Sequence, residues 1–347
     1  MIIEKMKKFW KNLDKLYLAI LIILVAVTIY FVRSTAGDEK GTKNISLRLR
    51  WLHQTQFAGI YWADQFALFD GYNLSVELRT SGPGVNFIQG VATGNEDFGI
   101  AGAGQIVEAR DKGLPVVALA VIFQKNPNVF FWLKDSVKNV QDWENKTIAV
   151  FYGYDHEYMY KAILDSFKIN RKTITEVPVT PDMGRFFKGE VQVWGGYKIN
   201  QPLTAKEKGF EIVTLDPDTL GLDVPGDVLF TSEKMVKENP ELVQNVVNCV
   251  LSGWIEALKN SEKAIMTVKK YQTNFNYKHE KQMMDEIQKL VINENKPEKF
   301  GWMYDEKWQK IIQIWKKYGG IKKEVKTEEC FNNNFVINYY KDHDPQN

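Results

Sequence analysis

The stretch "RWLHQTQFAGIYWADQFALFDGYNLSVEL", residues 50–78, decides how the rest of the sequence is interpreted. It overlaps "ISLRLRW" (45–51), where apolar residues alternate with period two, as in a strand with one buried face. "FAGIYWADQFALF" (57–69) has helical spacing, with Gly71 as its expected end, and "LSVEL" (74–78) is the next expected strand. A strand, a helix and a strand in this order predict an open α/β sheet.

The alternation of strands and helices continues along the chain. "PVVALAVIF" (115–123) is a continuous apolar run, typical of a buried parallel strand. A second cycle starts after "QKNPN" and ends with a long amphipathic helix after Pro240. From residue 261 onward the chain is rich in lysine and helical in pattern, with Trp302, Trp308 and Trp315 as expected anchors. The pattern predicts an α/β protein with two compact halves.

The composition excludes several classes of protein. The 347 residues are 44% hydrophobic and 25% charged, which suits a globular chain long enough for two cores. The net charge of +2 provides no basic excess for nucleic-acid binding. No CxxC, HExxH or histidine cluster occurs, so neither a metal site nor a cofactor is expected. Cys249 lies in an apolar helical pattern and is interpreted as a core residue, while a disulfide with Cys330 stays an open alternative.

The N-terminal segment carries a membrane signal. Leu16–Val32, "LYLAILIILVAVTIYFV", is an uncharged run of 17 residues. As a helix it would span about 26 Å, close to the thickness of a hydrocarbon core. Lysines precede it, so residues 1–36 are expected to form a cytoplasmic stub and a signal-anchor, followed by a linker at 37–43. A signal peptide cleaved within 34–36 is the alternative. The chain is therefore expected at the cell membrane, single-pass, with its soluble domain extracytoplasmic.

The loops that follow the predicted strands carry aromatic rings, side-chain amides and glycines. In open α/β sheets, ligands bind beyond the carboxyl ends of strands, where loops and helix starts meet. Rings stack on flat molecules, amides bind donor and acceptor edges, and helix starts accept partial negative charge. No Ser, His and carboxylate arrangement indicates hydrolysis, so we expect a binding protein and not an enzyme. The predicted contacts are Trp51, Gln54, Phe57, Gly102, Gln124, Tyr152, Tyr154, Tyr197 and Asn200.

Several of these residues also allow a purely structural interpretation. Trp51 could be a core tryptophan at a strand end, and Gly102 and Gly104 could serve close helix packing. His156 and Glu157 could form an acid/base pair, but a solvated helix start is the favoured interpretation.

The segments that carry these residues resemble a known family. "RWLHQTQFAGIYWADQFALFDGYNLSVEL", "SGPGVNFIQGVATGNEDFGIAGAGQIVEARDKGLPVVALAVIFQKNP", "WENKTIAVFYGYDHE" and "GGYKINQPLTAKEKGFEIVTL" are similar to substrate-binding proteins of ABC importers. The branch contains binders of thiamine-precursor pyrimidines, riboflavin, and sulfonates such as taurine. The resemblance covers about 45–260 in the same order and is weak after about 270.

The resemblance implies a periplasmic-binding-protein-like fold of type II, with two α/β lobes and a ligand clamped in the cleft. It implies that 44–131 and 229–347 form lobe 1, with the C-terminal helices, and that 132–228 form lobe 2. Closure would be a hinge motion in which the ligand selects the shut state. The implied partners are an ABC permease and its ATPase.

Departures from the family's sequence patterns narrow the choice of ligand class. The family's pyrimidine synthases use a histidine six residues after the strand-end tryptophan and a cysteine-rich loop; this chain has Phe57 there and no cysteine in 220–230. Pyrimidine transporters often show Trp-x-Pro-Asn, whereas this chain has Trp51-Leu52-His53-Gln54. The pattern Gln54-x-x-Phe57-Ala58-Gly59 and "SGPG" resemble riboflavin-type binders more closely. The family's Asn-Glu-Pro step is here Asn200-Gln201-Pro202, which lacks the carboxylate.

These features together predict a membrane-anchored extracytoplasmic solute-binding protein for a flat heterocyclic vitamin or precursor. A riboflavin-like flavin is favoured over a thiamine-precursor aminopyrimidine. One alternative is a binder of sulfonate- or nitrate-type anions, held at the helix starts near Gly104 and Gly153. A further alternative is a thiamine pyrimidine synthase-like enzyme, against which Phe57 argues.

Overall fold

The structure is a computed structural model that describes residues 41–82, 85–291 and 300–343. The described chain from Asn44 onward belongs to one compact unit. The predicted anchor Leu16–Val32, the stub before it and most of the predicted linker lie outside the described residues. Among the helices that are described, none has both the length and the apolar character needed to cross a membrane.

The first sheet has five strands in the order β2-β1-β3-β10-β4. Strand β1 pairs in parallel with β3, while β10 runs antiparallel between β3 and β4. The prediction that the apolar run 115–123 forms a parallel strand was wrong, because its paired neighbour β10 is antiparallel. The run is continuously apolar because both faces of β4 are covered by packed segments. The bounds are β1 (Lys43–Arg48), β2 (Leu74–Arg79), β3 (Phe98–Gly102), β4 (Val116–Val121) and β10 (Asp227–Ser232).

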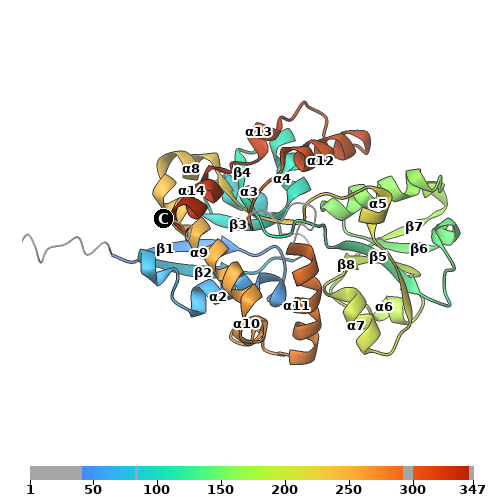
Figure 1. The fold of residues 1–347 in the computed structure, drawn as a ribbon. Coiled ribbons are helices and arrows are strands. Elements are labelled where there is room, and N and C mark those ends of the chain that lie inside the picture. Colours follow the sequence, from blue (N-terminus) through green and yellow to red (C-terminus); the bar gives the residue numbers. More distant parts are fainter. Residues whose placement is uncertain (1–40, 83–84, 292–299, 344–347) are drawn as a thin grey trace, which may run out of the picture. The chain divides into compact units, whose positions relative to one another are not determined.

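Helices cover both faces of the first sheet (Figure 1). One face packs on α2 (Ala58–Gln65), α9 (Pro240–Lys259), α10 (Ser261–Val268), α11 (Tyr277–Val291) and α14 (Asn334–Asp342). The other packs on α3 (Phe87–Ala92), α4 (Ala103–Asp111), α12 (Asp305–Lys317) and α13 (Thr327–Cys330). Short α8 (Glu233–Glu238) follows β10 directly. The C-terminal helices therefore belong to the core, and the predicted anchors Trp308 and Trp315 are fully buried.

Helix α2 ends earlier than its hydrophobic pattern predicts. Its last residue is Gln65, and Ala67 takes the left-handed conformation with φ 57°. The Leu68 N–H donates to the Ala63 carbonyl at 2.9 Å, which is the hydrogen bond of a Schellman motif. Gly71, the predicted end, lies beyond this turn, so that expectation was wrong. The early end lets Phe69 turn back into the core, where it is buried.

The second sheet has five strands in the order β7-β6-β8-β5-β9. Strand β6 pairs in parallel with β7 and β8, and β5 runs antiparallel between β8 and β9. The strands are β5 (Asn128–Leu133), β6 (Thr147–Val150), β7 (Thr175–Pro178), β8 (Val193–Tyr197) and β9 (Ile212–Leu215). The accompanying helices are α5 (Asp155–Ser166), α6 (Gly184–Phe187) and α7 (Gln201–Glu207). The 3₁₀ turns of the described chain are η1 (Thr55–Phe57), η2 (Asp70–Tyr72), η3 (Val140–Trp143), η4 (Arg171–Thr173) and η5 (Pro217–Leu220).

Strand β5 shows how one apolar run serves two cores. Successive side chains of a strand point to opposite faces. Phe130 and Trp132 therefore enter the core shared with α4, α5 and α12, while Val129 and Phe131 pack with α6 on the opposite face. Because the shared core contains residues of both sheets, the two halves are joined by continuous apolar packing.

The chain passes between the two sheets twice. It leaves the first sheet after β4, enters the second at β5, and returns between β9 and β10. We use lobe 1 for the first sheet and the helices packed on it, and lobe 2 for the second sheet with α5, α6 and α7. The predicted boundaries at 131/132 and 228/229 fall inside β5 and β10, so the sheets change a few residues before each of them.

Candidate ligand-binding site

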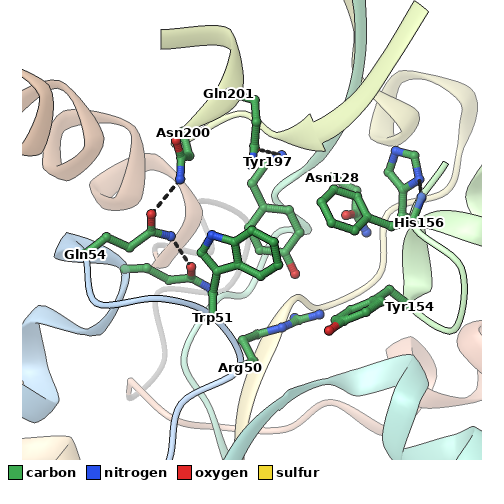
Figure 2. A pocket seen from close by; sticks show the side chains of 11 residues that line it. Arg50, Trp51, Gln54, Asn128, Tyr154, His156, Tyr197, Asn200 and Gln201 are labelled. Atoms are coloured by element: carbon green, nitrogen blue, oxygen red, sulfur yellow. Dashed lines mark hydrogen bonds between the residues drawn. The ribbon is translucent and has the colours of Figure 1, made fainter. Parts of the chain in front are cut away.

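A pocket with an enclosed volume of about 30 Å³ lies where loops of both lobes meet (Figure 2). It lies beyond the carboxyl ends of β1, β6 and β8, which is where open α/β sheets bind ligands. This volume is far below the roughly 300–1,000 Å³ of a small-molecule site, so the two lobes would have to move apart to admit a ring ligand. The lining residues are Arg50, Trp51, Gln54, Gln56, Asn128, Phe151, Tyr154, His156, Tyr197, Asn200 and Gln201.

Aromatic side chains from both lobes form the walls of the pocket. Trp51 of lobe 1 meets Phe151 of lobe 2 edge to face, with ring centroids 5.8 Å apart. The Arg50 guanidinium lies over the rings of Tyr154 and Tyr197, at 5.7 and 5.2 Å from their centroids. Such cation–π contacts orient flat groups against one another. The walls therefore offer ring faces suited to a planar ligand.

A chain of hydrogen bonds runs along the lobe 1 side of the pocket (Figure 2). The Asn200 amide of lobe 2 donates to Gln54 Oε1 at 2.6 Å. Gln54 Nε2 donates to Gln56 Oε1 at 2.5 Å, and Gln56 Nε2 donates to Asp227 Oδ2 at 2.6 Å. The loop itself is held by the Thr55 N–H, which donates to the Glu280 carboxylate of α11 at 2.7 Å. The amides that face the pocket are thus fixed before any ligand arrives.

Arg50 extends this chain back to lobe 2. Its Nη1 donates to Asp227 Oδ1 at 2.6 Å, and its Nη2 donates to Gln105 Oε1 at 3.2 Å. Gln105 Nε2 in turn donates to the Gly153 carbonyl at 3.2 Å. The chain therefore leaves lobe 2 at Asn200, crosses lobe 1 and reaches lobe 2 again at Gly153. Closure of the lobes and order within the pocket depend on the same hydrogen bonds.

Buried charges shift one another's pKa beneath the pocket. Burial acts to lower the pKa of Arg50, but Tyr197, Asp227 and Asp155 raise it above its ordinary value. Burial raises the pKa of Asp227, against the opposing effect of Arg50 and of hydrogen bonding. Burial also raises the pKa of Asp155 to about 6, again opposed by Arg50. Because a buried charge without a partner is costly, Arg50 is required for the carboxylates beneath the pocket to stay ionised.

His156 is a buried neutral ring. Burial lowers its pKa to about 3, only partly offset by the Val129 carbonyl, so the imidazole is uncharged at physiological pH. It packs against Phe130 with ring centroids 4.1 Å apart. Glu157 instead pairs with Lys161 at 2.6 Å. The interpretation of His156 as a solvated helix start was wrong, because its ring, 1% exposed, packs between the second sheet and the pocket.

The comparisons with known proteins agree with this architecture. A family model described as NMT1/THI5 like matches residues 54–264, more than half of the chain. This chain belongs to the NMT1/THI5-like family. The resemblance inferred from the sequence is thereby confirmed.

Two relatives of this NMT1/THI5-like chain carry names that refer to ligands. It is 24% identical to the riboflavin-binding protein RibY of Chloroflexus aurantiacus, over 85% of this chain and 86% of the relative. It is 22% identical to the formylaminopyrimidine-binding protein of Halalkalibacterium halodurans, over 89% and 97%. The aliphatic sulphonate binding protein SsuA of Escherichia coli shares the fold, with a TM-score of 0.65 and 15% identity over 82% of this chain and 91% of that one. The two-sheet, periplasmic-binding-protein-like fold predicted from the sequence is confirmed.

The structure brings together some of the predicted contact residues of this family member. Trp51, Gln54, Tyr154, Tyr197 and Asn200 line the pocket. Their role as ligand contacts stays a prediction.

The remaining predicted contacts lie elsewhere. Gly102 lies behind the pocket at the start of α4. Phe57 is buried in the lobe 1 core against Tyr61. Gln124 donates to the Trp302 carbonyl at 2.8 Å, away from the pocket. Tyr152 is 43% exposed and donates to Glu176 at 2.8 Å. Each of the last three therefore has a structural role of its own within the fold.

Sequence reasoning missed the charged residues beneath the pocket. Arg50 is the penultimate residue of the alternating run "ISLRLRW", whose pattern predicts a strand, although its side chain is only 3% exposed. Its partner Asp227 is 177 residues away in the sequence, so no local pattern connects the two. Sequence reasoning also missed three lining residues: Asn128, Gln56 and Phe151. Gln56 and Phe151 lie close in sequence to the predicted contacts Gln54 and Tyr154, and that proximity is the only signal that could have indicated them.

Both cysteines are free and buried. Cys249 lies in the core of lobe 1, as predicted, and burial raises the pKa of its thiol to about 12. Cys330 lies in the shared core, and burial raises the pKa of its thiol to about 12 as well. Neither thiol is therefore a reactive thiolate, and the two are not joined.

Proposed function

We propose that this chain is the solute-binding component of an ABC importer and binds a flat, uncharged heterocycle with polar edges. A riboflavin-like flavin is the favoured ligand, and an aminopyrimidine related to thiamine is the second. The observation that carries the proposal is the pocket itself, whose aromatic walls and fixed amides come from both lobes. The names of the two sequence relatives support the same two ligand classes.

The pocket supplies two kinds of contact to such a ligand. Trp51 and Tyr197, from opposite lobes, provide faces on which a ring can stack. Gln54 and Asn200 provide amide groups at the ring's edge, already held by their mutual hydrogen bond. Because these contacts come from both lobes, a bound ring stabilises the closed arrangement over an open one. Binding would then select the closed state.

We further propose that the chain binds its ligand without transforming it. His156 is buried and neutral, and the two cysteine thiols are buried away from the pocket. The described residues that line the pocket therefore present neither a thiolate nor a histidine able to act as a general base. The enzymatic alternative is thiamine pyrimidine synthase-like catalysis. Phe57 argues against it, because this buried core residue stands where the family's enzymes use histidine.

The proposed place of action is the outer side of a cell membrane. The apolar run Leu16–Val32 would anchor the chain by a single helix, with the soluble domain extracytoplasmic. An ABC permease and its ATPase would be the partners that receive the ligand. Carbonate extraction of membranes from cells expressing the full chain tests the anchor, because an uncleaved helix keeps the protein in the pellet.

The ligand is tested by calorimetric titration of the full chain with riboflavin, an aminopyrimidine and taurine. Saturable binding of one ring compound at micromolar concentration or below is the expected result. Trp51→Ala should weaken it, whereas Phe66→Ala, which removes an exposed aromatic ring outside the pocket, should not. Binding of taurine alone would contradict the proposal and move the chain to the anion-binding class.

A further inference from the structure

Asp155 of lobe 2 is inserted against the start of helix α4 in lobe 1. Its side chain is only 1% exposed, and it lies in the first turn of α5. A Cβ atom placed on Gly102 or Gly104 would lie closer to its carboxylate oxygens than real Cβ atoms approach a neighbour. Gly102 therefore makes room for this carboxylate, and Gly104 makes room for it together with the Trp315 ring. The predicted contact residue Gly102 has this role and not one in the pocket lining.

The carboxylate occupies a position that favours negative charge. Helix starts carry unpaired N–H groups and a partial positive charge, and they bind anions for that reason. The N-cap of α4 is Gly102, which has no side chain to accept from them. Asp155 faces the backbone N–H of Gln105, which acts to lower its pKa, yet neither of its oxygens completes a hydrogen bond within the described residues. The protein thus supplies its own anion at this helix start.

The other positive groups near the pocket are also neutralised by carboxylates. Arg50 is paired with Asp227 at 2.6 Å and lies within electrostatic reach of Asp155. At the start of α5, the Gly153 N–H donates to the Glu157 carboxylate at 3.1 Å. The anion-binding alternative relied on these two helix starts, near Gly104 and Gly153. In the structure each of them faces a side-chain carboxylate of α5.

We propose that Asp155 is a specificity-determining residue that excludes anionic solutes from the pocket and reserves it for uncharged ligands. A solute anion that approached Arg50 or the start of α4 would be repelled by the charge of Asp155. The Asp155 carboxylate also already occupies the position that the anion would take. An uncharged ring meets no such repulsion. The inference rests on the proposed function and extends it, because it names the charge class of the ligand and the residue that sets it.

The test compares small anions with uncharged ligands in three variants at pH 7.5. Asp155→Ala removes both the charge and the side chain, and Asp155→Asn removes the charge at nearly constant volume. Asp165→Asn is the matched control, since it removes one charge from the same helix at an exposed position that pairs with Lys317. Nitrate, methanesulfonate and riboflavin are titrated into each full-length protein by calorimetry, after circular dichroism has established that it is folded.

We expect the wild type and Asp165→Asn to bind both anions equally weakly. Asp155→Ala should bind nitrate at least about tenfold more tightly than the wild type, a change of about 1.4 kcal/mol. Asp155→Asn should show a smaller gain in nitrate affinity, because the repulsion is lost while the side chain still fills the space. If Asp155→Ala does not fold, the result for Asp155→Asn decides the test. Unchanged anion affinity in the folded variants, or wild-type binding as tight as that of Asp155→Ala, would overturn the inference.

The riboflavin titrations separate this inference from the proposed function. Binding of riboflavin by the wild type, with no anion gain in either variant, would refute the role of Asp155 alone. A gain in anion binding, with every uncharged ligand rejected by the wild type, would support the role of Asp155 and refute the proposed ligand class.

Discussion

The loop after β1 and the loop after β6 occupy matching places at the carboxyl ends of their strands, but they are held in different ways. In the first loop, Arg50, Gln54 and Gln56 all take part in the hydrogen-bonded chain that ends on Asp227. In the second, the Asp155 carboxylate and His156 Nε2 are buried without a completed hydrogen bond among the described residues. One loop is ordered by its own lobe, whereas the other depends on what lies across the cleft. Loss of Arg50 should therefore affect stability most, whereas changes at Asp155 should affect binding.

Arg50→Met should break the first loop and produce the largest effect. It removes the cation between Asp227 and Asp155, leaving two buried carboxylates without compensation. We expect the free energy of unfolding to fall by about 3–5 kcal/mol in urea titrations at pH 7. Arg79→Met is the matched control, because Arg79 pairs only at the surface with Glu77 and its loss should change little. Equal stability of the two variants would contradict the assigned role of Arg50.

Trp51→Ala removes a ring face from the lobe 1 wall of the pocket. Trp51 is only partly buried and meets Phe151 across the cleft, so the fold should tolerate the change. Affinity for the ring ligand should fall by about 1–3 kcal/mol, measured by calorimetry beside Phe66→Ala. Unaltered affinity in a folded Trp51→Ala protein would remove this residue from the binding site.

The contact between Asn200 and Gln54 joins the two lobes directly. Asn200→Ala and Gln54→Ala, together with the double variant, form a thermodynamic cycle for ligand affinity. We expect a coupling energy of about 1 kcal/mol, because each single change removes the same hydrogen bond. Strictly additive effects would show that the two amides act independently in the closed state.

The ionisation of Asp155 should make binding depend on pH. In the closed structure burial raises its pKa to about 6, whereas an exposed aspartate has its ordinary value of 3.8. Closure therefore takes up a proton, so affinity is highest below about pH 4, falls as pH rises toward 6, and is level above. Arg50, Asp227 and Glu108 face this carboxyl and modulate its charge.

With these two pKa values, Kd should weaken by roughly 25-fold between pH 4.5 and 7.5. Calorimetry of the wild type beside Asp155→Asn measures it, since the variant lacks the titrating group. An identical pH profile in both proteins would assign the dependence to another residue.

Much of the fold could be predicted because the patterns that specify it are local. The alternation in 45–51 and the helical spacing that begins at Phe57 identified β1 and α2. The end of α2 and the antiparallel partner of β4 were not predictable in this way. The first depends on Phe69 turning back into the core, and the second on a strand more than a hundred residues away.

The residues of the candidate site likewise divide into those that a local pattern indicated and those that depend on distant segments. Trp51, Gln54 and Tyr154 were identified because ring and amide side chains after a strand indicate binding from residue type alone. Arg50 and Asp155 were missed because what distinguishes them is burial beside charges from distant segments. Phe57 was placed in the site because the neighbouring loop suggested it, whereas the 3₁₀ turn points its ring into the core.

The hydrogen-bonded chain from Asn200 to Asp227 has a direction, and the carboxylate sets it. A carboxylate that accepts from Arg50 can only accept from Gln56, so Gln56 must present its oxygen to Gln54, and Gln54 its oxygen to Asn200. No amide in the series can turn over without breaking the bonds on either side. Two solutes that differ only in exchanging a ring carbonyl for a ring N–H would therefore meet a surface of fixed polarity. The distinction between them is made by a buried charge that touches neither.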